Sequence, residues 1–154
     1  MDCYTAAVRI LQYRFNSEAE LRRKLASKKF DAEAIDAAIA RLREEKWLDD
    51  ERFAEAFVRT RMRKRVGRLR VRRELTAAGV AADVTAEALR RNVDEGEERA
   101  ALEELCAKRL RLLARRHGEE YAAGREGRDK VVAYLMGQGY EMSQILDVLR
   151  KKQS

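Results

Sequence analysis

The chain contains no proline, two cysteines and one histidine among its 154 residues. Proline interrupts helices and alanine, a leading apolar residue here, forms them best, so this composition favours helix. Aromatic residues make up only 6% of the chain and charged residues 40%, so its apolar faces must be narrow and its cores small. We therefore expect an all-α protein built from several small helix groups.

Few residues are available for metal binding or catalysis. Cys3 and Cys106 belong to no C-x-x-C pair and accompany a single histidine, His117, so neither a zinc site nor a disulfide framework is predicted. No Ser/His/Asp arrangement, phosphate-binding glycine loop or outstanding carboxylate pair occurs. We expect no enzyme activity: no catalytic residue, no metal and no cofactor.

The sequence also lacks a long apolar run. No window approaches the roughly 20 apolar residues that a membrane helix needs, and no apolar run follows a basic start. We expect a cytoplasmic protein with reduced thiols. The net charge of +7 predicts attraction to something anionic, and charge alone leaves nucleic acid, an acidic protein or a membrane surface open.

One apolar pattern occurs three times. In the first and last copies five apolar residues have offsets of 0, 4, 9, 14 and 18. These residues are Leu21, Leu25, Phe30, Ile35 and Ile39 in the first copy and Val131, Leu135, Tyr140, Ile145 and Leu149 in the last. The middle copy has Val71, Leu75, Val80 and Leu89, with one slip: Val84 comes one place early and Thr85 fills the expected slot. Such self-similarity indicates a repeat architecture.

Each repeat is predicted to contain three helices. The boundaries are 1–48 for repeat 1, 49–95 for repeat 2 and 96–154 for repeat 3. Repeat 3 opens with a long helix over Glu97–Arg116, followed by a Gly-rich loop over 117–127 and two short helices. The predicted architecture is three tandem three-helix repeats forming an elongated, curved modular rod. Such a rod has no need to dimerise, and we expect a monomer.

Capping signals mark several helix starts. Ser17 followed by Glu20 is a capping-box pattern. Asp31 is placed to cap the closing helix of repeat 1, and either Asp49 or Asp50 can cap the leading helix of repeat 2.

Glycine marks the turn before the closing helix in two repeats. Gly79 and Gly139 occupy equivalent turns, where a left-handed residue commonly ends a helix. Lys29 stands at this position in repeat 1. There the turn must form without glycine, at a modest energetic cost.

Repeat 2 carries a basic run of nine Lys or Arg among fifteen residues, without one acid. The nine cations are Arg59, Arg61, Arg63, Lys64, Arg65, Arg68, Arg70, Arg72 and Arg73. If one helix continued across Gly67, Arg61, Arg65, Arg68 and Arg72 could share a face. Neighbouring cations with no acid among them repel each other unless a partner neutralises them. We therefore favour a binding surface over an ordinary solvated face. The acid-rich stretch 94–104 offers the alternative of neutralisation within the protein.

The order of motifs over nearly the whole chain resembles the RecX family of bacterial recombination regulators. The resemblance rests on Ser17-x-x-x-Leu21-x-x-x-Leu25, Leu48-Asp49-Asp50-x-x-Phe53-Ala54, Gly67-x-x-x-Val71-x-x-Glu74-Leu75-x-x-x-Gly79-Val80, and Leu135-x-x-x-Gly139-Tyr140. The residues that match the family signature are Asp49, Asp50, Phe53 and Ala54. We interpret all four as mostly structural. Two departures are Lys29, in place of a common glycine, and the weakly basic segment 136–138.

The resemblance implies a modulator, mainly an inhibitor, of the recombinase RecA. It implies binding in the groove of the RecA filament on single-stranded DNA, with effects on recombination, ATP hydrolysis and SOS coprotease activity. The basic run is then the expected contact. We expect it to bind single-stranded DNA directly or through RecA, in a weak, salt-sensitive way. No membrane partner is expected. Two alternatives remain open: a stand-alone DNA-binding module like a helix-turn-helix domain, and a helical scaffold that recognises an acidic protein.

Overall fold

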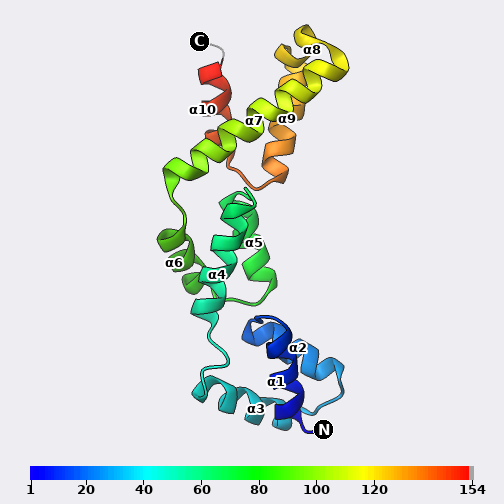
Figure 1. The fold of residues 1–154 in the computed structure, drawn as a ribbon, viewed down its shortest axis with the longest axis vertical. Coiled ribbons are helices and arrows are strands. Elements are labelled where there is room, and N and C mark those ends of the chain that lie inside the picture. The colour runs from blue at the N-terminus through cyan, green and yellow to red at the C-terminus, as the bar shows by residue number, and fades with distance from the viewer. Residues whose placement is uncertain (153–154) are drawn as a thin grey trace. The chain divides into compact units, whose positions relative to one another are not determined.

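The computed structural model describes residues 1–152, which form ten α-helices and no strand (Figure 1). This confirms the predicted all-α class. The helices are α1 (Cys3–Tyr13), α2 (Glu18–Ser27), α3 (Ala32–Glu44), α4 (Asp50–Arg63), α5 (Arg68–Ala77), α6 (Ala82–Asn92), α7 (Glu95–His117), α8 (Glu119–Ala123), α9 (Arg125–Gly137) and α10 (Met142–Lys152).

The helix starts use the predicted side chains. The Ser17 Oγ accepts a hydrogen bond from the Glu20 amide, and the Glu20 carboxylate accepts one from the Ser17 amide, so the capping box of α2 is confirmed. Asp31 Oδ1 accepts from the Ala34 amide at 2.8 Å and caps α3. Local sequence therefore fixes these two starts, because each cap satisfies amides that have no partner inside the helix.

The chain divides into two compact units. Unit 1 comprises Met1–Phe57 and Arg73–Arg91, and unit 2 comprises Val58–Arg72 and the chain from Asn92 on. In unit 1, α1, α2 and α3 (blue to cyan in Figure 1) enclose a core whose largest members are Leu21, Leu25, Ile39 and Leu42.

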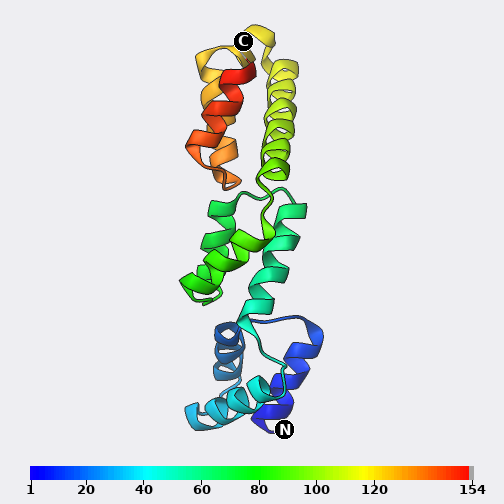
Figure 2. The same cartoon turned by 90° about the vertical axis from the view of Figure 1, so that its left-hand side faces the viewer.

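Unit 2 has its own core between α7, α9 and α10. Its buried side chains include Leu102, Cys106, Leu135, Tyr140 and Ile145. Figure 2 shows α7 lying alongside α9 and α10, which contact it along this core.

The repeated apolar slots are buried as the pattern predicts. All five slots of the last copy are buried, and so are those of the first copy except Phe30, which is partly buried. In the middle copy Thr85 is only 1% exposed whereas Val84 is partly exposed, so the core slot belongs to Thr85. The Thr85 hydroxyl has no hydrogen-bond partner among the described residues, a source of instability in this repeat.

The turn before the closing helix is left-handed in all three copies. Its φ is 79° at Gly79, 100° at Gly139 and 73° at Lys29. The first copy therefore forms the predicted turn without glycine, and strain there amounts to about 1 kcal/mol.

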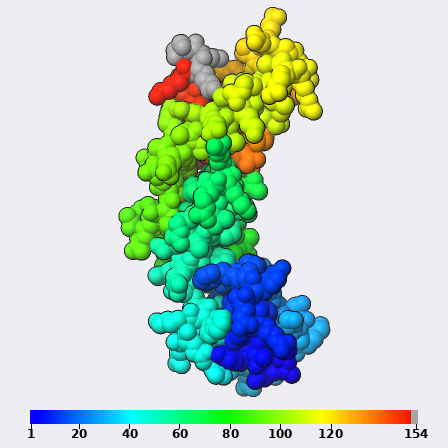
Figure 3. All heavy atoms as spheres, in the orientation of Figure 1, coloured from blue at the N-terminus to red at the C-terminus, as the bar shows by residue number. Residues whose placement is uncertain are grey.

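The prediction of a loop over 117–127 is wrong, because most of this segment is helical. Helix α8 fills Glu119–Ala123, and α9 begins at Arg125. Gly127 lies inside α9, where an added Cβ would come within 2.4 Å of the Tyr121 carbonyl oxygen. The absence of a Cβ at Gly127 therefore lets α8 and α9 pack closely. Helix α8 also packs against the end of α7, and the two form one yellow mass in the space-filling view (Figure 3).

Within unit 1, the end of α5 packs against the start of α2. Ser17 Oγ donates a hydrogen bond to the Ala78 carbonyl at 2.5 Å, and the Arg23 guanidinium donates one to the Ala77 carbonyl at 2.9 Å. A Cβ on Gly79 would lie 2.3 Å from the Cβ of Ala19. We call this contact the first joint.

Within unit 2, the turn after α9 packs against the start of α5 in the same manner. The Gly67 amide donates to the Gln138 carbonyl at 2.7 Å and the Leu69 amide to the Gly139 carbonyl at 3.0 Å. A Cβ on Gly67 would lie 2.3 Å from the Gly139 carbonyl carbon, and one on Gly139 would lie 2.4 Å from the Arg70 Cβ. We call this contact the second joint.

Candidate nucleoprotein-binding site

The basic run does not lie on one continuous helix. Helix α4 ends at Arg63, Arg65 takes a left-handed φ of 59°, and α5 begins only at Arg68. The condition for a shared face of Arg61, Arg65, Arg68 and Arg72, one helix continuing across Gly67, is therefore not met. The second joint explains the break, because the backbone at Gly67 turns to donate its amide to the Gln138 carbonyl.

The nine cations differ in exposure. Arg61, Arg68 and Arg70 are partly buried, whereas the remaining six are exposed. Those six are Arg59, Arg63, Lys64, Arg65, Arg72 and Arg73, of which Arg73 belongs to unit 1 and the others to unit 2.

Arg68, partly buried, forms an ion pair with the buried Glu98 of α7. The Arg68 Nη2 lies 2.9 Å from Glu98 Oε1 and the Arg68 Nε lies 3.2 Å from Glu98 Oε2, a two-pronged geometry. Glu98 has a side chain that is only 2% exposed, and it also accepts a hydrogen bond from Gln144 at 2.9 Å. The hydrogen bonds to Glu98 raise the pKa of the Arg68 guanidinium. Arg68 is thus a structural member of the basic run.

The acid-rich stretch also reaches the run at Arg65. Its guanidinium lies 2.9 Å from the Glu104 carboxylate, but both side chains are largely exposed, at 43% and 59%. Exposed pairs of this kind contribute little to stability. The alternative of internal neutralisation therefore holds firmly for Arg68 and only weakly for Arg65.

The exposed cations at the end of α4 are held by uncharged neighbours. Arg59 donates to the Asn92 side-chain oxygen at 3.3 Å, and Arg63 to the Thr60 hydroxyl at 3.4 Å. Neither contact cancels the positive charge, so both guanidinium groups can still attract an anion.

Tyr140 fixes the backbone in the middle of the run. Its hydroxyl donates to the Arg65 carbonyl at 3.2 Å, and burial raises the pKa of Tyr140 to about 12. The run is therefore presented by an anchored backbone rather than by a mobile tail.

The four signature residues each have a structural contact. Asp49 Oδ1 accepts from the Glu51 and Arg52 amides and so caps α4. Its neighbour Asp50 instead accepts from the Glu18 amide at the start of α2, and burial raises the pKa of this carboxyl.

The two apolar signature residues are buried. Ala54 is fully buried, and the ring of Phe53 stacks on Phe57 with ring centroids 5.9 Å apart. These contacts leave Phe53 unavailable for stacking on a base.

A second cationic surface was missed by the sequence reasoning. The second half of α7 exposes four cations at helical spacing, namely Lys108, Arg111, Arg115 and Arg116. Leu112, 37% exposed, lies among them. The sequence carries a signal for it, because the stretch 105–118 contains no acid, although its cations are less dense than those of the basic run in repeat 2. We call these four cations the α7 stripe.

Neither a metal site nor a membrane helix is found within residues 1–152. The described part of the chain holds no group of three His, Cys, Asp or Glu side chains arranged to bind a metal ion. None of its helices combines the length and the apolar character needed to cross a bilayer.

Two family profiles match the chain. The profile "RecX, first three-helix domain" matches residues 3–42, and "RecX, second three-helix domain" matches residues 49–89. Three named relatives are similar over most of their length. "Regulatory protein RecX" of Escherichia coli (strain SE11) is 36% identical, covering 94% of this chain and 87% of the relative. The proteins of the same name from Serratia proteamaculans and Clostridium perfringens (strain 13) are 31% and 29% identical, with 96% and 68% of the relative covered.

Solved structures share the fold. The crystal structure of RecX from Lactobacillus salivarius superposes with a TM-score of 0.79 at 23% identity, over 97% of this chain and 93% of that one. Another crystal structure, of a regulatory protein RecX, gives a TM-score of 0.77 at 22% identity, over 94% and 70% of the two chains.

Proposed function

The chain belongs to the RecX family, and from this premise we propose that it regulates a RecA recombinase, mainly as an inhibitor. In this proposal it binds the groove of the RecA filament on single-stranded DNA and lowers recombination, ATP hydrolysis and SOS coprotease activity. It acts as a cytoplasmic monomer and carries out no catalysis of its own.

The observation that carries the proposal is a set of exposed cations on an anchored backbone. Arg59, Arg63 and Lys64 are exposed at the end of α4 in unit 2, and the second joint holds the chain directly after them. Anchored cations lose less conformational entropy on binding than a mobile basic tail does. This arrangement suits a filament groove, where phosphates and protein lie together.

The α7 stripe supplies a further contact region in the same unit. Its cations repeat along one side of a helix, a spacing that suits an extended phosphate backbone. In this proposal repeat 3 therefore takes part in filament binding, despite the weakly basic segment 136–138.

A charge-removal variant tests the proposal. Arg59→Ala, Arg63→Ala and Lys64→Ala are combined, and binding to RecA filaments on fluorescent oligothymidylate is measured across a salt series. We expect affinity to fall about tenfold or more, and the log-log salt slope to fall by about 2, because roughly three phosphate contacts are lost.

The matched control removes three exposed cations elsewhere: Lys46→Ala, Arg52→Ala and Arg90→Ala. It should bind within about twofold of the wild type, because the proposal places no filament contact at these three residues. Equal binding by the two triple variants would show that the end of α4 is not the contact surface.

The stand-alone DNA-binding alternative fits the geometry less well. A recognition helix presents its first turn to base edges, but the first turn of α5 is covered by the carbonyls of Gln138 and Gly139. Its first residue, Arg68, is held by Glu98. Tight, sequence-selective binding to duplex DNA without RecA would favour this alternative instead.

A further inference from the structure

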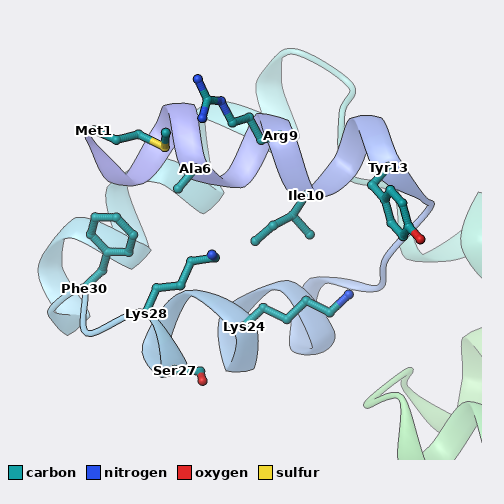
Figure 4. A pocket seen from close by; sticks show the side chains of 9 residues that line it. All are labelled: Met1, Ala6, Arg9, Ile10, Tyr13, Lys24, Ser27, Lys28 and Phe30. Carbon is teal, nitrogen blue, oxygen red and sulfur yellow. The ribbon is translucent and has the colours of Figure 1, made fainter.

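A groove of about 710 Å³ lies between α1 and α2 in unit 1 (Figure 4), whereas the cations of the proposed contact belong to unit 2. Ile10 points from α1 into this space, and Phe30 stands at one end of it. At the other end Tyr13 is 91% exposed. The groove therefore offers apolar surface that the core of unit 1 leaves uncovered.

The charged side chains along the groove all have one sign. Arg9, Lys24 and Lys28 line it, and no Asp or Glu does. In Figure 4 Lys28, just after α2, extends toward α1, whereas Lys24 extends along α2. Lys24 donates to the Asn16 side-chain oxygen at 2.6 Å, and burial lowers its pKa.

Other cations of unit 1 do find acidic partners. Arg22 pairs with Asp36 at 2.6 Å, and Arg41 pairs with Glu45 at 2.8 Å. In contrast, Arg9 and Lys28 form no ion pair with any residue that the structure describes. Apolar surface bordered by unpaired cations is typical of a site for an anionic partner with an apolar anchor.

The concave shape favours a peptide over nucleic acid. Single-stranded nucleic acid binds through open aromatic faces on which bases stack, whereas an interhelical groove with an aliphatic floor takes a side chain from a peptide. We propose that the α1–α2 groove binds an acidic peptide segment, which inserts one large apolar side chain between Ile10 and Phe30 while its carboxylates meet Arg9, Lys24 and Lys28.

Fluorescence anisotropy tests this with the whole chain. The probes are a labelled peptide of Asp and Glu with one central Phe, the same peptide with Ala in place of Phe, and a labelled oligothymidylate. The Phe peptide should bind at least about fivefold more tightly than the Ala peptide, because only the former fills the apolar floor.

Two variants of the chain complete the test. The double variant Arg9→Glu and Lys28→Glu should weaken Phe-peptide binding about tenfold or more, because it turns attraction into repulsion at the groove. Ile10→Ser should weaken it about fivefold and remove most of the preference for Phe. The control Arg52→Glu and Lys46→Glu makes the same charge change at exposed sites outside the groove and should leave affinity within about twofold.

Several outcomes would overturn the proposal. The first is failure of the Phe peptide to bind, and the second is equal affinity for the Phe and Ala peptides. The third is an equal effect of the groove and control variants. The fourth is oligothymidylate binding that displaces the peptide and is weakened by Ile10→Ser, because the groove would then be a nucleic-acid site. Circular dichroism of each variant checks that helix content is unchanged. None of these results depends on RecA, so this proposal can fail while the proposed function stands.

Discussion

The first and second joints solve the same packing problem in different ways. In both, the end of one repeat's middle helix packs on the start of the preceding repeat's middle helix. The first joint uses side chains, since Ser17 and Arg23 donate to the carbonyls of Ala78 and Ala77. The second uses the Gly67 and Leu69 amides as donors, and the Tyr140 hydroxyl donates to the Arg65 carbonyl beside them.

This difference matters for function because the second joint lies inside the basic run. The two backbone hydrogen bonds of the second joint come from amides and not from side chains, so they do not depend on which side chains the run carries. Repeat 2 can therefore carry many cations without weakening its own packing. The first joint, which depends on the side chains of residues 17 and 23, offers no such freedom.

The largest expected effect comes from closing the space in the second joint. Gly67→Ala places a Cβ 2.3 Å from the Gly139 carbonyl carbon, where backbone on both sides cannot easily yield. We expect a loss of about 3 kcal/mol in the free energy of unfolding, measured by urea denaturation and by faster exchange of the Leu69 amide.

The control for this change is Gly137→Ala, at the end of α9. An added Cβ there meets nothing within 4 Å, so stability should rise by about 0.4–1 kcal/mol, because alanine lowers the entropy of the unfolded chain. If the two variants are equally stable, the second joint does not constrain the basic run.

Breaking the buried ion pair should have the next largest effect. Arg68→Met leaves Glu98 buried without its cation and should cost about 2 kcal/mol, whereas Arg65→Ala should cost less than about 0.5 kcal/mol because its pair is exposed. A double-mutant cycle with Glu98→Gln measures the coupling. A coupling energy near zero would contradict the structural role of Arg68.

The first joint should respond to loss of one hydroxyl. Ser17→Ala removes both the helix cap at Glu20 and the bond to the Ala78 carbonyl, and we expect a loss of about 1.5 kcal/mol. Glu33→Ala, an exposed change within α3, serves as the control, and thermal unfolding compares them. Equal melting temperatures would mean that the first joint contributes nothing.

The smallest effect concerns the left-handed turn at Lys29, which is part of neither joint. Lys29 holds the left-handed position in repeat 1, and Lys29→Gly should raise stability by about 0.5–1 kcal/mol, because glycine adopts this φ without strain. Urea denaturation measures the gain. A loss of stability would show that the Lys29 side chain makes a contribution that the turn geometry does not reveal.

Sequence predicted what depends on local pattern. The apolar slots, the Ser17 capping box and the left-handed turn at Lys29 all follow from spacing and backbone chemistry over a few residues. The joints were not predicted, because Gly67 and Gly139 are 72 positions apart and no local rule links them. For the same reason the sequence left open whether one helix continues across Gly67, and the structure shows a break there, beside the contact of the Gly67 amide with Gln138.

The glycine content of 117–127 led to a wrong prediction of a loop. The glycines of 117–127 indicated a flexible loop, yet Gly127 is small so that α9 can approach the Tyr121 carbonyl of α8. Pairing of Arg68 with Glu98 was likewise one option among many in an acid-rich stretch, and only packing selects it. The candidate site was thus foreseen as a set of residues, but the division between structural and exposed cations required the structure.

We propose that this chain restrains RecA through the exposed cations of repeat 2. The most direct measurement is ATP hydrolysis by RecA on single-stranded DNA, titrated with the wild-type chain and with the Arg59→Ala, Arg63→Ala, Lys64→Ala variant. We predict that sub-stoichiometric wild type depresses turnover and that the variant needs about tenfold more protein for the same effect. Unchanged turnover across a wide range of wild-type concentration would contradict the account.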